Sequence, residues 1–170
     1  LPKPEINKLV QHRETEKNFL NENSIATTKY VTIRDENDLY ENVHLLPGIL
    51  KTTTLGYDGK GQYKLNSAED INNHLDFKKE YILEKLINLK KEISVVITRY
   101  NQENYEIYEP IENIHEEQIL KYSTIPCNIS EDIKTKSIEW AKQVVEKLDY
   151  IGTLCVEFFI DEEANLYANE

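Results

Sequence analysis

The strongest constraint on the fold is a glycine-rich loop that separates two short strand-like segments. Gly48-Ile49-Leu50-Lys51-Thr52 reads as an apolar strand with one lysine near its end, and Gln62-Tyr63-Lys64-Leu65 reads as the strand that follows. The loop between them, Gly56-Tyr57-Asp58-Gly59-Lys60-Gly61-Gln62, holds three glycines within six residues. Because glycine tolerates positive φ and places no side chain in front of the backbone N–H groups, such a loop can form an anion-binding nest.

Two lysines beside the loop indicate which anion it would cover. Lys51 and Lys60 add positive charge to the backbone N–H groups, which favours a polyphosphate. The spacing Gly-x-x-Gly-Lys-Gly and the strand that follows do not match a Walker A loop, which leads into a helix. A flap between two strands is closer to the phosphate-covering loop of protein kinases. The alternative is an ordinary hairpin whose glycines only serve the turn.

Size and charge limit the class of protein. With 170 residues the chain suits one domain or two small lobes, with enough length to bury a core. The formal net charge of −11 argues against nucleic acid as the main partner, because phosphate backbones need a clustered basic face. No apolar run approaches the ~20 residues of a membrane span. Cys127 and Cys155 lie far apart without metal-ligand spacing, so we expect them to stay reduced in the cytosol.

Two features of the sequence indicate that the chain is a piece of a longer protein. The chain contains no methionine. Its last residues, Asn165-Leu166-Tyr167-Ala168-Asn169-Glu170, read as a strand that stops in mid-course. We therefore interpret the chain as one part of something larger.

The remaining pattern predicts a mixture of helices and strands. Asp35, Ser67 and Ser130 are typical N-caps, and the last begins the clearest helix, which has acids in its first turn and an apolar stripe. The predicted helices are 13–23, 35–46, 67–75 and 130–148, and the predicted strands are 30–33, 48–52, 62–65, 81–86, 93–100, 105–108, 154–160 and 166–170. The segment 110–127 is expected to be irregular or edge-like. Because the order shows no regular βαβ alternation, the predicted fold class is α+β.

Glu157 lies inside the most apolar strand of the chain, where a lone carboxylate costs several kcal/mol unless it is paired. If the returning strand pairs through a four-residue loop, the expected pairs are Asp161 with Leu166, Phe159 with Ala168, and Glu157 with Glu170. Like charges directly across a ladder are unfavourable, and a divalent cation reverses that sign. Mg²⁺ favours one or two carboxylates with substrate phosphate oxygens, and Asn169 can add an amide oxygen. The alternative is that Glu157 faces solvent.

The segment Tyr81-Ile82-Leu83-Glu84-Lys85-Leu86-Ile87 predicts a third part of a site. A hydrophobic strand that ends in a connector can offer backbone N–H and C=O groups to an adenine edge. Glu92, just beyond, can accept from ribose hydroxyls. A solvated Glu-Lys pair is the commoner explanation for such residues.

Taken together, these residues resemble the ATP-grasp superfamily, and within it the family of 5-(carboxyamino)imidazole ribonucleotide synthetases. The resemblance spans nearly the whole chain. It is carried by Gln11-His12-Arg13-Glu14-Thr15-Glu16-Lys17, Leu50-Lys51-Thr52, Gly56-Tyr57-Asp58-Gly59-Lys60-Gly61-Gln62, Glu84-Lys85, Glu92-Ile93-Ser94-Val95, Glu112-Asn113-Ile114-His115, Asp149-Tyr150-Ile151-Gly152, Val156-Glu157-Phe158-Phe159 and Asn169-Glu170. The Gly-Tyr-Asp-Gly-Lys-Gly-Gln run is fairly specific, and its order with the others makes the match strong.

The resemblance implies two lobes with ATP between them, a β-rich lid at about 25–85 and the start of a larger lobe at about 86–170. Phosphates would be contacted by Arg13 and by the catalytic Lys51, under the loop of Gly56, Tyr57, Asp58, Gly59, Lys60, Gly61 and Gln62. The adenine slot would be lined by Glu84, Lys85, Leu86 and Ile87, with Glu92 at the ribose and His115 nearby. Glu157 and Glu170 would hold Mg²⁺ with Asn169 alongside. Without the family, His115 would be interpreted as a surface or turn histidine.

The chain also departs from the family pattern. Thr53 and Leu55 stand where the family usually has an arginine and the first of two paired glycines, which weakens one potential phosphate contact and stiffens the flap. We expect the family's amino-terminal Rossmann-like domain to be missing. The Pro-Arg-x-His-Asn-Ser-Gly-His stretch and the carboxy-terminal domain are also expected to be missing, and with them part of the substrate site.

The chemistry that the resemblance implies is ATP-dependent carboxylation of 5-aminoimidazole ribonucleotide by bicarbonate, through carboxyphosphate, in purine biosynthesis. A homodimer is expected, without nucleic acid or membrane partners. One alternative is another ATP-grasp ligase, such as a formate-dependent glycinamide ribonucleotide transformylase or a biotin carboxylase, which the Tyr57-Asp58 pair disfavours. The other is a nucleotide-binding module without turnover.

Overall fold

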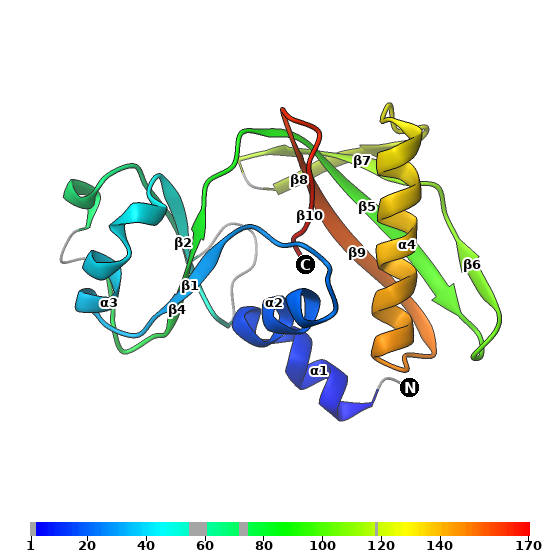
Figure 1. The fold of residues 1–170 in the computed structure, drawn as a ribbon, viewed down its shortest axis with the longest axis horizontal. Coiled ribbons are helices and arrows are strands. Elements are labelled where there is room, and N and C mark those ends of the chain that lie inside the picture. The colour runs from blue at the N-terminus through cyan, green and yellow to red at the C-terminus, as the bar shows by residue number, and fades with distance from the viewer. Residues whose placement is uncertain (1–2, 55–60, 72–74, 118) are drawn as a thin grey trace.

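The computed structural model describes residues 3–54, 61–71, 75–117 and 119–170. It is an α+β structure built on two antiparallel sheets that lie side by side, and the chain ends between them (Figure 1). The predicted fold class is therefore confirmed. The part of the glycine loop from 55 to 60, with Gly56, Tyr57, Asp58, Gly59 and Lys60, lies outside the described residues. No helix within the described ranges is both long enough and apolar enough to cross a membrane.

The smaller sheet has the strand order β1-β4-β2-β3. Its strands are β1 (Tyr30–Ile33), β2 (Gly48–Thr52), β3 (Gln62–Leu65) and β4 (Tyr81–Lys85), and the short helices α3 (Glu36–Glu41), η1 (Val43–Leu45) and η2 (Ala68–Asp70) accompany them. One face packs into a core of its own around Ile33, Leu39, Leu50, Tyr81 and Leu83. The two strands predicted beside the glycine loop are confirmed, and they pair with each other, Lys51 with Gln62 and Gly48 with Leu65.

The larger sheet has the order β10-β9-β5-β7-β8, with β6 pairing the far end of β5. Its strands are β5 (Leu89–Arg99), β6 (Tyr105–Ile107), β7 (Ile111–Glu116), β8 (Ile119–Thr124), β9 (Gly152–Asp161) and β10 (Leu166–Ala168). Helix α4 (Glu131–Lys147) covers one face (Figure 1). Because strand side chains alternate between faces, Ile93 and Val95 reach the core under α4, whereas Glu92 and Ser94 lie on the opposite face.

The predicted helix over 130–148 is confirmed, and its start follows the expected chemistry. The hydroxyl of Ser130 accepts from the backbone N–H of Ile133, and Glu131 and Asp132 lie in the first turn. The apolar stripe, which includes Ala141 and Val145, is buried against β5 and β9.

Two helices near the amino terminus lie between the sheets (Figure 1). They are α1 (Pro4–Val10) and α2 (Arg13–Glu22). The backbone N–H of Arg13 donates to the carbonyl of Thr53 at 2.9 Å, which fixes the start of α2 to the end of β2. After α2, Thr27 forms a parallel bridge with Ala168. The chain around α2 therefore contacts β2 of the smaller sheet at one end and β10 of the larger sheet at the other.

Three local predictions need correction. The segment expected to be irregular, 110–127, forms the antiparallel strands β7 and β8, because Pro110 and Pro126 bound this hairpin and do not interrupt it. The helix expected over 35–46 ends at Glu41 and continues only as η1. The helix expected after Ser67 is the three-residue η2, which Ser67 caps, and residues 72–74 lie outside the described ranges.

The predicted register of the final hairpin is wrong by one residue. Leu166 pairs with Ile160 and Ala168 with Phe158, not with Asp161 and Phe159. The carboxylate of Asp161 accepts from backbone N–H groups inside the turn, which shortens the loop so that Asp161 N–H donates to the Asn165 carbonyl at 3.1 Å.

The last residues nevertheless reach Glu157. Its N–H donates to the carbonyl of Glu170 at 2.7 Å, and its carbonyl accepts from Asn169 N–H at 2.8 Å. One residue thus faces two, as in a β-bulge, and the predicted neighbours Glu157 and Glu170 still meet.

The core of the larger sheet makes a stability prediction. Phe158 is fully buried and packs beside Trp140, with ring centroids 6.3 Å apart. Phe158→Ala should lower the free energy of unfolding by about 3–5 kcal/mol, because it removes buried apolar atoms and leaves a cavity. Urea unfolding measures this. Tyr100→Ala, at a residue that is 58% exposed, is the control and should change stability by about 0.5 kcal/mol or less.

Candidate active site

A cavity of about 330 Å³ lies between the two sheets, and seven of the predicted nucleotide-binding residues line it: Lys51, Gln62, Glu84, Lys85, Leu86, Ile87 and Glu92. The smaller sheet contributes side chains from β2, β3 and β4, the connector after β4 follows, and β5 and β9 complete the wall. Its lining consists of Thr28, Ile49, Lys51, Gln62, Lys64, Glu84, Lys85, Leu86, Ile87, Leu89, Glu92 and Phe159. The structure therefore places the predicted lysine, the predicted adenine slot and the predicted ribose carboxylate around one cavity.

The most buried polar group at this cavity is the carboxylate of Glu84, on the central strand β4. Lys51 Nζ lies 3.0 Å from its Oε1, and Lys17 Nζ lies 3.4 Å from its Oε2. The hydroxyl of Thr28 donates to Oε2 at 3.0 Å. Glu84 is 3% exposed, so the alternative of a solvated Glu84-Lys85 pair is wrong.

Charge keeps this carboxylate ionised. Burial by itself raises the pKa of Glu84, but the two lysines, Lys51 before Lys17, together with Thr28 outweigh it and hold the pKa at about 2. Burial lowers the pKa of Lys17, and the Glu84 carboxylate opposes that shift. The group is a buried salt-bridged triad in which each charge depends on the others.

Backbone hydrogen bonds fix the position of the end of β4 and of the connector that follows it. The N–H groups of Lys85 and Leu86 donate to the carbonyls of Lys29 and Pro47 at 2.8 and 2.9 Å. A Cβ at Gly48 would lie 2.8 Å from the carbonyl oxygen of Glu84, so only glycine allows β2 to approach β4 there.

A second polar group occupies the face of the larger sheet that α4 leaves uncovered. Glu92 on β5 pairs with Asn113 on β7, and Ser94 pairs with Glu157 on β9, so these side chains share one face. His115 Nδ1 lies 3.0 Å from Oε2 of Glu92. The predicted ribose carboxylate and the predicted nearby histidine are therefore direct neighbours.

Acids crowd together on this face. Burial raises the pKa of Glu157, and the negative charges of Glu170 and Glu92 raise it further, while His115 opposes them. Burial also raises the pKa of Glu92, against the pull of His115 and Lys51. The like-charge repulsion expected between Glu157 and Glu170 is thus present.

The oxygen donors at the end of the chain fit a divalent cation. Asn169 Oδ1 is buried and has no hydrogen-bond partner within the described part of the protein. It belongs to the residue between β10 and Glu170, next to two carboxylates whose negative charges repel each other. A hard cation would satisfy the amide oxygen and offset the repulsion, and oxygen donors of this kind are those that Mg²⁺ prefers.

Arg13 lies at the start of α2, beside the end of the chain. Its Nη1 is 3.8 Å from Oε2 of Glu170, and its side chain is largely buried. A cavity of about 410 Å³ adjoins both residues and is also lined by Thr53 and Thr54. Thr53 is buried and donates both its N–H and its hydroxyl to the carbonyl of Glu80, so this position ties strand ends together.

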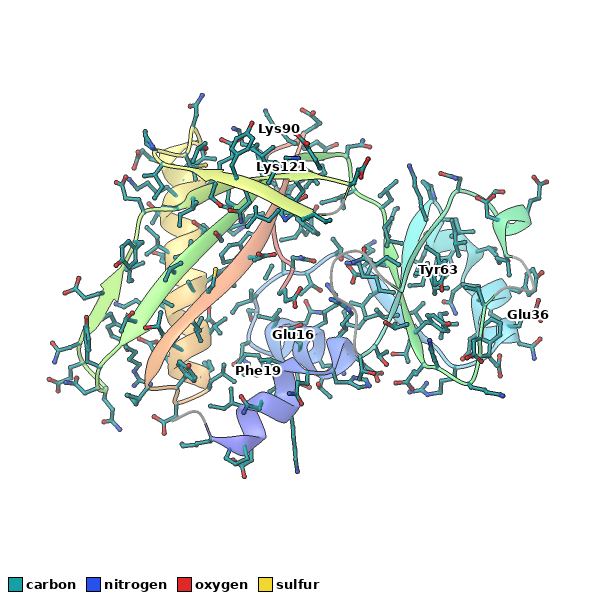
Figure 2. All side chains as sticks on the ribbon, turned by 180° about the vertical axis from the view of Figure 1, so that it is seen from behind. Glu16, Phe19, Glu36, Tyr63, Lys90 and Lys121 are labelled. Atoms are coloured by element: carbon teal, nitrogen blue, oxygen red, sulfur yellow. The ribbon has the colours of Figure 1, made fainter. Side chains whose placement is uncertain are left out.

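The sequence analysis did not identify Glu16 and Lys17 as buried groups, although both belong to the 11–17 motif that contributes to the family resemblance. Figure 2 shows Glu16 and Phe19 on α2, between the two sheets. Burial, and then the charge of Glu170, raise the pKa of Glu16 to about 8. Helical spacing places Lys17 four residues after Arg13 on the same side of α2, which is the signal that could have found it.

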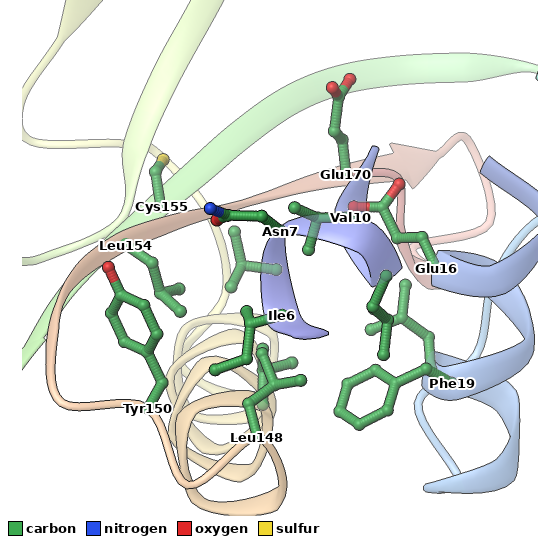
Figure 3. A pocket seen from close by; sticks show the side chains of 14 residues that line it. Ile6, Asn7, Val10, Glu16, Phe19, Leu148, Tyr150, Leu154, Cys155 and Glu170 are labelled. Atoms are coloured by element: carbon green, nitrogen blue, oxygen red, sulfur yellow. The ribbon is translucent and has the colours of Figure 1, made fainter. Parts of the chain in front are cut away.

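Glu16 also lies at one end of a third, mainly apolar cavity of about 320 Å³ between α1, α2, α4 and β9. Figure 3 shows Glu16 and Glu170 at one end of this cavity and Tyr150 at the other. Ile6 and Leu148 contribute to its apolar wall.

One further cluster has metal-ligand spacing within the described residues. One ligand atom from each of His12, Glu14 and Glu80 lies within 4.8 Å of the others. Arg34 already lies 3.2 Å from a Glu80 oxygen and 3.8 Å from a Glu14 oxygen, so these carboxylates have a cation. The cluster joins α2 to the smaller sheet.

Comparison with known proteins agrees with this geometry. The family model of the ATP-grasp domain matches residues 18–170, and the chain belongs to that family. The fold class and the resemblance read from the motifs are thereby confirmed.

Its similar relatives carry one activity in their names. The chain is 38% identical over 176 positions to N5-carboxyaminoimidazole ribonucleotide synthase of Brucella melitensis, covering 100% of this chain and 49% of the relative. The crystal structure of N5-carboxyaminoimidazole synthetase from Staphylococcus aureus complexed with ADP matches with a TM-score of 0.88 and 33% identity, over 95% of this chain and 44% of that one.

A third match, the carboxyaminoimidazole ribonucleotide synthase of Aspergillus clavatus complexed with ATP, has a TM-score of 0.87 and 26% identity over 96% of this chain and 44% of that one. The chain thus spans about half the length of the curated relatives it matches.

The triad around Glu84 predicts an acid-labile contribution to stability. The pKa of the Glu84 carboxyl falls from an ordinary 4.5 to about 2 on folding. The stabilisation of the folded state by ionised Glu84 is therefore complete above pH 4.5 and is lost as the pH falls toward 2. Glu84→Gln should lower the free energy of unfolding by about 3 kcal/mol at pH 7 and flatten its decline over that pH window.

Urea unfolding at several pH values measures both effects. Glu116→Gln, at an exposed carboxylate paired only with Lys121, is the matched control and should leave the profile unchanged. An unaltered acid profile in Glu84→Gln would show that Glu84 titrates normally.

Proposed function

We propose that this ATP-grasp domain belongs to an enzyme that uses ATP to carboxylate 5-aminoimidazole ribonucleotide with bicarbonate. The products would be 5-(carboxyamino)imidazole ribonucleotide, ADP and phosphate, in purine biosynthesis. The observation that carries the proposal is the single cavity shared by Lys51, the connector after β4 and Glu92. The names of the relatives, and the ADP and ATP bound in two matching structures, support it.

The nucleotide would lie with its adenine against the connector. Glu84 to Ile87 line that end of the cavity, and Glu92, paired with His115, would meet the ribose. The phosphates would extend toward Lys51 and Arg13 under the loop of residues 56–62. In this arrangement the smaller sheet would act as the lid lobe at about 25–85, and the larger sheet would belong to the second lobe at about 86–170.

The carboxylates of Glu157 and Glu170, with the amide oxygen of Asn169, would hold Mg²⁺. A bound Mg²⁺ offsets phosphate charge and orients the phosphoryl oxygens. The orphaned amide oxygen of Asn169 supports this donor set.

In the reaction, a bicarbonate oxygen would attack the γ-phosphoryl group, forming carboxyphosphate and releasing ADP. The amine of aminoimidazole ribonucleotide would then take the carboxyl group as phosphate leaves. Lys51 would stabilise the negative charge on the phosphoryl group that is transferred, and the guanidinium of Arg13 would position the phosphates of the nucleotide. We propose that the enzyme works in the cytoplasm as a homodimer.

Nucleotide binding tests this proposal directly. Lys51→Ala should weaken the binding of Mg·ATP at least ~10-fold, because it removes a buried charge-assisted contact. Isothermal titration calorimetry measures the affinity, and Lys121→Ala, at an exposed lysine away from the cavity, should bind as the unaltered protein does. ATP hydrolysis stimulated by aminoimidazole ribonucleotide should disappear with Lys51→Ala. A rate of ATP hydrolysis that does not change when aminoimidazole ribonucleotide is added would contradict the proposal that this compound accepts the carboxyl group.

The metal donors make a separate prediction. Glu157→Gln should raise the Mg²⁺ concentration needed for half-maximal ATP binding by ~10-fold or more, because one of two carboxylates is lost. Calorimetry at a series of Mg²⁺ concentrations measures this shift. Glu116→Gln removes one exposed carboxylate elsewhere and should not move the curve. An equal Mg²⁺ requirement in Glu157→Gln and the unaltered protein would exclude Glu157 as a ligand.

A further inference from the structure

Lys17 is a buried cation to which the proposed reaction assigns no task. Its side chain is 2% exposed, and its only ion pair within the described residues is with Glu84. Its Nζ also lies 5.9 Å from the centroid of the Tyr30 ring. Burying an ammonium group costs stability unless a partner compensates, so its place beside Glu84 calls for a physical reason.

The arrangement around Glu84 is asymmetric with respect to the cavity. Lys51 and Glu84 line it, whereas Lys17 is not among its lining residues. Glu84 therefore has one lysine on the ligand side and one on α2 that a ligand does not meet. A nucleotide phosphate competes with Glu84 for Lys51 alone.

That competition has an electrostatic cost. Lys51 Nζ lies 3.0 Å from Glu84, and turning toward a phosphate weakens this contact. A carboxylate that is 97% buried and loses its only cation is strongly destabilised. With Lys17 at 3.4 Å and the Thr28 hydroxyl at 3.0 Å, Glu84 keeps a cation and a hydrogen-bond donor when Lys51 turns away.

We propose that Lys17 is a positioning residue that remains paired with Glu84 as its counter-ion whether or not a nucleotide is bound. Lys51 is then available to the phosphates of the nucleotide. This inference rests on the proposed function, because it takes Lys51 as a phosphate ligand. Lys17 itself touches neither the nucleotide nor the reacting atoms.

A double-variant cycle tests the inference through Mg·ATP affinity measured by calorimetry. Lys17→Met keeps an unbranched side chain that is one atom shorter and removes its charge, so Glu84 then holds Lys51, and binding should weaken ~10-fold or more. In a Glu84→Gln background nothing holds Lys51, so adding Lys17→Met should weaken binding by less than ~3-fold relative to Glu84→Gln alone.

Two further variants separate charge from packing. Lys17→Arg keeps the positive charge and should bind within ~3-fold of the unaltered protein. Glu22→Met changes an exposed side chain on the same helix and should have no effect on affinity. An equal loss from Lys17→Met in both backgrounds, or no loss in either, would overturn the role of Lys17.

Failure of the inference and failure of the proposed function give different results. If the unaltered protein does not bind Mg·ATP, the proposed function falls and the inference falls with it. If the unaltered protein binds and Lys17→Met binds equally well, only the inference falls.

If Lys17→Met does not fold, the unaltered protein supplies the test by lysine side-chain NMR during titration with Mg·ADP. The signal of Lys51 should move and that of Lys17 should stay nearly in place. A Lys17 signal that moves as far as that of Lys51 would mean that Lys17 meets the nucleotide directly, and would overturn the inference.

Discussion

The site depends on one buried carboxylate. Glu84 lies on the central strand of the smaller sheet, and Lys51 reaches it from β2 and Lys17 from α2. Without this carboxylate, two ammonium groups would lie buried side by side with no counter-ion, which lowers the stability of the fold. The triad therefore fixes where α2 meets the sheet, and with it the place of Arg13 at the start of that helix.

The larger sheet presents the opposite imbalance. Its uncovered face carries Glu92 and Glu157, with Glu170 beside them, against one imidazole at His115. Each sheet has its own apolar core on its far side, so neither needs the other to bury hydrophobic surface. The cavity between them has apolar lining at Ile49, Leu86 and Phe159. Its charged groups are divided, with a surplus of cations on the wall of the smaller sheet and of anions on the wall of the larger sheet. The proposed ligand, a triphosphate with a divalent cation, would complement both walls.

Local pattern predicted most elements, because caps and periodicity act over a few residues. The start of α4 at Ser130 and the two strands on either side of the glycine loop follow from such signals. The failures are non-local or depend on side-chain detail. The register of the last hairpin slipped by one because the Asp161 carboxylate closes the turn early. The pairing of Lys17 with Glu84 joins residues 67 positions apart, and neither residue on its own indicates that the other is present.

Burial of a few cations would allow a chain with a net charge of −11 to hold the proposed polyphosphate. Surface charge acts over roughly 8–10 Å in physiological salt, so the excess acids elsewhere are screened from the site. Lys17, Lys51 and Arg13 are largely buried, where their fields are screened far less. Affinity for an anion is then set by the few cations that the fold withdraws from solvent, and the overall charge of the chain says little about it.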